Sequence, residues 1–139
     1  MIIYKLNIIN MKAEKFTIKS RIRSFGYAIN GLKIVFKNEH NFRIHTFAAF
    51  AVLIAGSIFK VSVTEWIILT LTIAFVMVVE ALNTAIEYVC NYLTKDYDYN
   101  IGVIKDVCAA AVLISAIGAA IVGIIIFAPK IFEMFISNL

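Results

Sequence analysis

Proline and glycine are scarce in this sequence, which has one proline and six glycines in 139 residues. Turn-rich β-sheet proteins and disordered chains use more of both, so the composition argues against these classes. Charged residues are also scarce, at 16%, whereas hydrophobic residues make up 62%. A soluble domain has about 25% charged and about 45–50% apolar residues. The sequence therefore predicts a single-domain, all-α integral membrane protein.

The sequence has few cysteines and none of the sequence motifs of soluble kinases. The two cysteines, Cys90 and Cys108, do not have the spacing of metal ligands. Both are expected near the reducing side of the membrane, where disulfides rarely persist, so we interpret them as small packing residues. No GxxxxGK[ST], HRD or DFG motif occurs. A function that uses nucleotide would therefore need a different kind of site.

Basic residues are concentrated in residues 1–45, which hold nine Lys or Arg and two Glu. Between residues 16 and 40, apolar side chains recur every three or four positions, from Ile18 to Phe36. This pattern predicts an amphipathic helix with a basic face, lying on an anionic membrane surface. We interpret residues 1–15 as an N-terminal extension without the apolar core of a signal peptide, and Met11 is an alternative start to Met1.

Three hydrophobic stretches follow, and we predict transmembrane helices at residues 42–59, 64–93 and 107–128. The third would be roughly 33 Å long, enough to cross a hydrocarbon core of about 30 Å, and Pro129 is expected to end it. With the N-terminus in the cytoplasm, eleven of the thirteen Lys and Arg residues lie on the inner side. The positive-inside rule favours this orientation in the cytoplasmic membrane.

A stripe of polar residues interrupts the second hydrophobic stretch. Its members fall within about 100° of one helix face at the usual helical period: Glu80, Asn83, Thr84, Glu87 and Asn91. Ionisable residues in a span cost about 2.5–3.5 kcal/mol or more, and they are expected to face a protein interior or a hydrated cavity. A seam that only fixes helix packing is the alternative interpretation. Two glutamates with an amide between them favour a functional site.

The depth of these carboxylates narrows the chemistry. Counted from Trp66, the hydrocarbon core ends near Ile86, so Glu87 is expected at the cytoplasmic interface, with Glu80 about 10 Å deeper along the helix. Glu39 precedes the first span, while Lys105 and Asp106 are expected where the third helix begins. Helix N-termini and lysine favour phosphate. Together these residues indicate a Mg²⁺–nucleotide site.

Four stretches resemble the prokaryotic diacylglycerol kinase family, which includes undecaprenol kinases. They are "GYAINGLK" (26–33), "NEHNFRIH" (38–45), "EALNTAIE" (80–87) and "KDVCAAAVL" (105–113). The resemblance implies a surface helix and three spans per subunit, assembled as a homotrimer. It implies transfer of the γ-phosphate of MgATP to the hydroxyl of a membrane lipid at the cytoplasmic interface. The expected partners are ATP, a lipid and other copies of the chain, with no nucleic acid.

The same resemblance implies a role for each matching residue. Glu80 would be the general base, and Asn83 would support the catalytic cluster. Glu39 and Glu87 would bind the Mg²⁺ that bridges the ATP phosphates. The remaining nucleotide contacts would be Tyr27, Asp96, Asp98, Lys105 and Asp106. The chain departs from the family pattern at Ser20, where an Arg is common, and at Asn91, where an Asp is common.

The lipid and two rival functions are left open by the sequence. "NEHNFRIH" is more similar to the undecaprenol kinases than to the enterobacterial diacylglycerol kinases, which favours undecaprenol slightly. One rival is a non-enzymatic subunit whose polar stripe conducts ions or protons, although Leu69, Ile73 and Val76 would offer no relay beyond Glu80. The other is a purely structural membrane protein packed through small residues. His40 and His45 receive no assigned role.

Overall fold

The computed structural model describes residues 17–136, which form four α-helices and no β-strand. The proposed extension at residues 1–15 and the choice between Met1 and Met11 lie outside the described residues. The chain divides into two units, Met1–Ile34 and Val35–Leu139. Each unit is described by itself below.

Helix α1, Ile18–Asn38, forms most of the described part of the first unit, and its residues 35–38 belong to the second unit. Its N-terminus is closed by two hydroxyl residues: the Ser20 N–H donates to Thr17 Oγ1 at 3.1 Å, and the Thr17 N–H donates to Ser20 Oγ at 3.4 Å. Such side-chain bonds satisfy N–H groups that a helix start leaves without partners. Ser20, which departs from the family pattern, therefore has a structural role here. No residue of α1 is buried.

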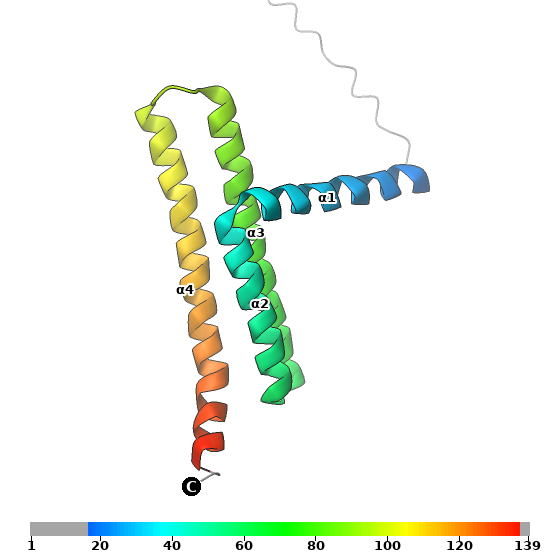
Figure 1. The fold of residues 1–139 in the computed structure, drawn as a ribbon, viewed down its shortest axis with the longest axis vertical. Coiled ribbons are helices and arrows are strands. Elements are labelled where there is room, and N and C mark those ends of the chain that lie inside the picture. The colour runs from blue at the N-terminus through cyan, green and yellow to red at the C-terminus, as the bar shows by residue number, and fades with distance from the viewer. Residues whose placement is uncertain (1–16, 137–139) are drawn as a thin grey trace, which may run out of the picture. The chain divides into compact units, whose positions relative to one another are not determined.

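The second unit contains three further helices: α2 (His40–Ile58), α3 (Val63–Leu93) and α4 (Tyr99–Ile136). All three are long and apolar enough to cross a membrane. Helix α3 packs against both α2 and α4, and the α3–α4 hairpin extends beyond the start of α2 (Figure 1). The predicted all-α class with three candidate spans is confirmed.

A tight turn joins α2 to α3. Lys60 takes a left-handed backbone conformation with φ of 49°, and the Val61 N–H donates to the Gly56 carbonyl at 3.1 Å. This six-residue closure is the Schellman arrangement that ends many helices. Val61 is buried against Leu69 and Ile126 in a small apolar cluster. The cluster packs α2, α3 and α4 together at their ends opposite the α3–α4 loop.

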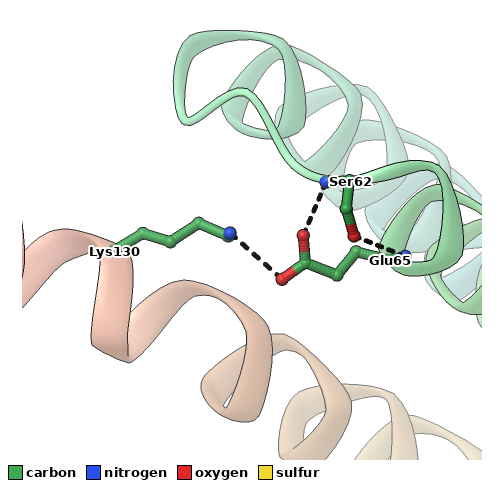
Figure 2. A network of polar contacts seen from close by, with 3 residues as sticks. All are labelled: Ser62, Glu65 and Lys130. Atoms are coloured by element: carbon green, nitrogen blue, oxygen red, sulfur yellow. Dashed lines mark hydrogen bonds and ion pairs between the residues drawn. The ribbon is translucent and has the colours of Figure 1, made fainter.

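Pro129 does not end the last helix, contrary to the sequence-based expectation, because α4 continues to Ile136. A proline removes one helical hydrogen bond, but membrane helices tolerate it. Figure 2 shows a side-chain contact of the residue that follows: Lys130 Nζ lies 3.1 Å from Glu65 Oε1 on α3. Glu65 also forms a reciprocal cap with Ser62 at the start of α3. The ion pair thus ties the segment after Pro129 to the N-terminus of α3.

The start of α4 also differs from the prediction, since the helix begins at Tyr99 rather than near residue 107. Asp98 Oδ1 accepts hydrogen bonds from the N–H groups of Asn100 at 2.8 Å and Ile101 at 3.1 Å. Asp98 is therefore the capping residue. Lys105 and Asp106 lie inside the helix, so the free N–H groups of a helix start are not beside them. The expected phosphate site at that N-terminus is corrected accordingly.

Candidate active site

The most deeply buried carboxylate of the described residues belongs to Glu80 on α3. Its side chain is only 2% exposed, and Oε2 has no hydrogen-bond partner in the part of the chain that the structure describes. Thr84, equally buried, donates its hydroxyl to the Glu80 backbone carbonyl at 3.1 Å and leaves the carboxylate free. A buried acceptor without a partner is costly, and such groups concentrate where a ligand or substrate completes the site.

One helical turn along the same stripe, Asn83 is bonded to Glu87. Asn83 Nδ2 donates to Glu87 Oε1 at 3.1 Å, which fixes the orientation of that carboxylate. Asn83 Oδ1 is buried and has no partner among the described residues. The predicted polar stripe thus contains two buried oxygen atoms, one on Glu80 and one on Asn83, that are available to a bound group.

A pocket of about 380 Å³ opens beside this stripe. Helix α3 contributes Asn83 and Glu87, α2 contributes Asn41 and His45, and α4 contributes an apolar wall that includes Val112. The pocket is therefore polar toward α2 and α3 and apolar toward α4. This asymmetry suits a ligand with both charged and apolar parts.

Glu39 stands directly before α2 as its N-cap residue, but its side chain makes no capping hydrogen bond. Its carboxylate therefore remains available. Glu39, Glu87 and His45 all lie close enough to Glu80 to interact with it electrostatically. Within residues 17–136, no cluster of three or more His, Cys, Asp or Glu could hold a metal ion alone. A cation here would need oxygen atoms from a substrate.

Lys105 on α4 contacts α3 near the turn that joins these two helices. Its Nζ donates to Asn91 Oδ1 on α3 at 2.8 Å. Asn91, which departs from the family pattern, therefore holds the lysine that sequence analysis assigned to the nucleotide. The two side chains are fourteen residues apart in sequence and are brought together by the turn between α3 and α4.

Three other expected nucleotide contacts, Asp96, Asp98 and Asp106, are not drawn into this cluster. The Asp98 carboxylate caps α4, and Asp96 lies in the preceding loop, where its backbone bonds to the Thr94 hydroxyl. Asp106 is exposed on α4. Tyr27 belongs to the first unit, where its side chain is 68% exposed.

Sequence analysis missed the contribution of α2 to the pocket. Asn41 and His45 are four residues apart, and Ala48 and Val52 continue the same face at helical spacing. This period was a usable signal that the histidine faces the other helices. A further contact, from Asn38 Nδ2 to the Tyr88 hydroxyl at 2.8 Å, joins the residue before Glu39 to α3. It positions the start of α2 beside the polar stripe.

The sequence profile described as prokaryotic diacylglycerol kinase matches residues 26–127, a range that contains Glu39, Glu80, Glu87 and Lys105. The chain belongs to the prokaryotic diacylglycerol kinase family. Members of this family phosphorylate lipids, and the buried carboxylate of Glu80 and the pocket described above lie within the matched range. This diacylglycerol kinase family member is therefore an ATP-dependent lipid kinase.

Individual relatives agree on the family but differ in the lipid named. Undecaprenol kinase of Bacillus subtilis (strain 168) is 38% identical over 109 residues, which cover 78% of this chain and 89% of that protein. A diacylglycerol kinase of Synechocystis is 39% identical over 115 residues, 81% of this chain and 65% of that protein. A diacylglycerol kinase of Escherichia coli (strain K12) is 34% identical over 100 residues, 72% of this chain and 82% of that protein. An ion-conducting subunit without enzyme activity is not favoured.

Proposed function

We propose that this lipid kinase transfers the γ-phosphoryl group of MgATP to the hydroxyl of a membrane lipid, with Glu80 as the general base. The observation that carries the proposal is the unpartnered Oε2 of buried Glu80, which lies one helical turn before Asn83, a lining residue of the pocket of about 380 Å³. A carboxylate held out of water and not bonded to protein is free to accept a proton from an alcohol. Its place inside a candidate span suits an alcohol that stays in the bilayer.

In the proposed reaction, Glu80 accepts the hydroxyl proton while the alcohol oxygen forms a bond to the γ-phosphorus. The bond from that phosphorus to the β–γ bridging oxygen breaks, and ADP leaves. Phosphoryl transfer depends mainly on positioning and on offsetting negative charge. The Asn83 amide holds Glu87 in place for this purpose. Lys105 would offset charge on the phosphate oxygens.

Glu39 and Glu87 fit the role of Mg²⁺ ligands. Mg²⁺ is usually held by one or two carboxylates together with substrate phosphates, rather than by a full protein cage. The free carboxylate of Glu39 and the absence of a three-ligand cluster in the described chain agree with that pattern. When bound, the ion would neutralise charge on the β- and γ-phosphates. Tyr27, Asp96, Asp98 and Asp106 are proposed as the remaining nucleotide contacts.

The proposed assembly is a homotrimer in the cytoplasmic membrane, with the N-terminus and the site on the cytoplasmic side. The distribution of Lys and Arg supports this orientation. The amphipathic pattern of α1 supports its placement on the membrane surface. Large apolar side chains are exposed along all three candidate spans, among them Phe50, Phe75 and Ile125. Lipid and neighbouring copies of the chain would cover them.

Undecaprenol is proposed as the preferred alcohol, with diacylglycerol as the second candidate. The stretch "NEHNFRIH" at residues 38–45 supports the first, and so does the alignment over 89% of the Bacillus subtilis undecaprenol kinase. The similar identity to diacylglycerol kinases supports the second. The two alcohols differ in the number of chains beside the hydroxyl.

The test is phosphorylation of defined lipids by the purified full-length protein. Radiolabelled ATP and Mg²⁺ are supplied in mixed micelles that contain undecaprenol, diacylglycerol or ceramide separately. We expect labelled lipid phosphate in the presence of undecaprenol, formed faster than with the other two alcohols. Faster labelling of diacylglycerol would overturn the substrate preference, and no labelled lipid with any alcohol would overturn the proposed reaction.

A further inference from the structure

A second, smaller pocket lies deeper between the same three helices. Its volume is about 90 Å³, and apart from His45 it is lined by apolar side chains, which include Ala48, Ala49, Val52, Val76, Met77 and Ala119. His45 also lines the larger pocket, so the two pockets share this side chain. The larger pocket has both polar and apolar walls, whereas the smaller one is suited to hydrocarbon.

The apolar pocket lies about one helical turn from the proposed base along α3. Val76 and Met77 line this pocket and are four and three residues before Glu80, which is about 4.5–6 Å along the helix axis. His45 on α2 is close enough to Glu80 to interact with it electrostatically. No hydrogen bond of the His45 ring is found among the described residues. A hydroxyl placed at His45 would therefore lie within about one helical turn of Glu80 along α3.

The volume of the apolar pocket limits what it can hold. A buried cavity of about 150 Å³ accommodates the six carbons of benzene, so about 90 Å³ suits about three or four carbons. That is enough for the first part of one hydrocarbon chain. A diacylglycerol carries two ester-linked chains close to its hydroxyl, and both cannot enter a space of this size. Small side chains keep the space open, because three of the lining residues are alanines.

We propose that the apolar pocket binds the first carbons of a single-chain lipid alcohol, with His45 at its mouth beside the hydroxyl and the alanines as specificity-determining residues. This inference rests on the proposed function, since it assigns the tail of the alcohol that Glu80 deprotonates. It explains how the enzyme would distinguish undecaprenol from diacylglycerol, by the number of chains beside the hydroxyl rather than by headgroup chemistry. The larger pocket then receives the phosphates on the other side of His45.

Filling the pocket tests this assignment. Ala49→Leu and Ala119→Leu each add a branched side chain to the lining, whereas Ala51→Leu and Ala120→Leu make the same change at exposed neighbouring positions outside the lining. The KM for undecaprenol, the KM for ATP and kcat are measured for the purified full-length proteins. Differences of one methylene in an apolar pocket change specificity by about 10–200-fold. We therefore expect the KM for undecaprenol to rise at least about tenfold in the lining variants, with the KM for ATP changed less than about twofold.

The possible outcomes test the tail pocket and the kinase reaction separately. Unchanged KM for undecaprenol in folded Ala49→Leu and Ala119→Leu proteins would overturn the tail pocket while leaving the kinase reaction intact. An equal rise in the exposed-site controls, or a change of oligomer size in the lining variants alone, would also overturn it, because protein packing would then explain the effect. Absence of lipid phosphorylation in the unaltered protein would overturn the proposed function itself. If neither leucine variant folds, Ala49→Val and its control Ala51→Val apply the same criteria with a smaller change.

Discussion

Lys105 on α4 and Asn91 on α3 are joined by a hydrogen bond of 2.8 Å across the hairpin. The bond holds a flexible lysine in one direction at the end of the molecule where the polar stripe begins. The side-chain oxygen of Asn91 accepts this bond from the lysine ammonium group. Asn91 thus becomes a positioning residue for the proposed nucleotide contact.

Replacing Asn91 by alanine is expected to weaken ATP binding. A hydrogen bond of this kind contributes about 0.5–1.5 kcal/mol, so the KM for ATP should rise about two- to tenfold. Kinetics with saturating lipid measure the effect. Asn91→Asp keeps an acceptor for Lys105 and should retain a KM nearer to that of the unaltered protein. Equal KM values for Asn91→Ala and the unaltered protein would show that Asn91 does not position Lys105 for ATP.

Replacing Asn83 by alanine is expected to raise the Mg²⁺ concentration needed for half-maximal activity. The Asn83 amide orients Glu87, and loss of a group that orients a metal ligand costs about 10–100-fold in metal affinity or activity. Titration with Mg²⁺ at fixed ATP measures this change, and EDTA should stop the reaction.

Ser57→Ala is the control, since it removes a side-chain hydrogen bond, from Ser57 Oγ to the Leu53 carbonyl, at the other end of α2. Its Mg²⁺ requirement should match that of the unaltered protein. A similar requirement in the Asn83→Ala and Ser57→Ala proteins would contradict the role given to the Asn83–Glu87 contact.

Replacing Gly56 by alanine is expected to destabilise the fold. A Cβ atom at this position would lie 2.6 Å from Cη2 of Trp66, whose rigid ring covers the glycine. Overpacking costs about 1–3 kcal/mol, so the temperature of thermal unfolding in detergent should fall. Gly102→Ala is the control, because nothing lies within 4 Å of its added Cβ atom. Equal unfolding temperatures for the two variants would contradict the Gly56–Trp66 packing.

The number of helices and the polar stripe could be predicted from the sequence because both depend on local periodicity. Hydropathy locates apolar helices, and Glu80, Asn83 and Glu87 recur at helical spacing. The predicted bounds of the last helix were wrong at both ends. Its first turns carry tyrosine and asparagine rather than an apolar run, and the segment after Pro129 is held by an ion pair with a distant residue.

Contacts between helices could not be predicted from the sequence because they depend on which helix faces are turned toward one another. The pairing of Lys105 with Asn91 requires the geometry of the α3–α4 turn. His45 was given no role from the sequence, yet it lines both pockets. Its place in both linings follows only once α2 is packed against α3. The sequence predicts which polar residues share a helix face more readily than which residues of different helices meet.

Glu80→Gln tests the central claim most directly. The substitution preserves the shape of the side chain but cannot accept the hydroxyl proton, and a general base contributes about 10²–10⁴-fold to a rate. Glu65→Gln is the matched control at the other end of α3, and its kcat should stay within about twofold of the unaltered value because a single lost hydrogen bond away from the site has little effect on the reaction.

The decisive measurement is kcat for lipid phosphorylation by purified, folded Glu80→Gln protein, together with its Kd for ATP. We expect kcat to fall at least about 100-fold while the Kd for ATP changes less than about threefold. A kcat close to that of the unaltered protein would contradict the assignment of Glu80 as the base.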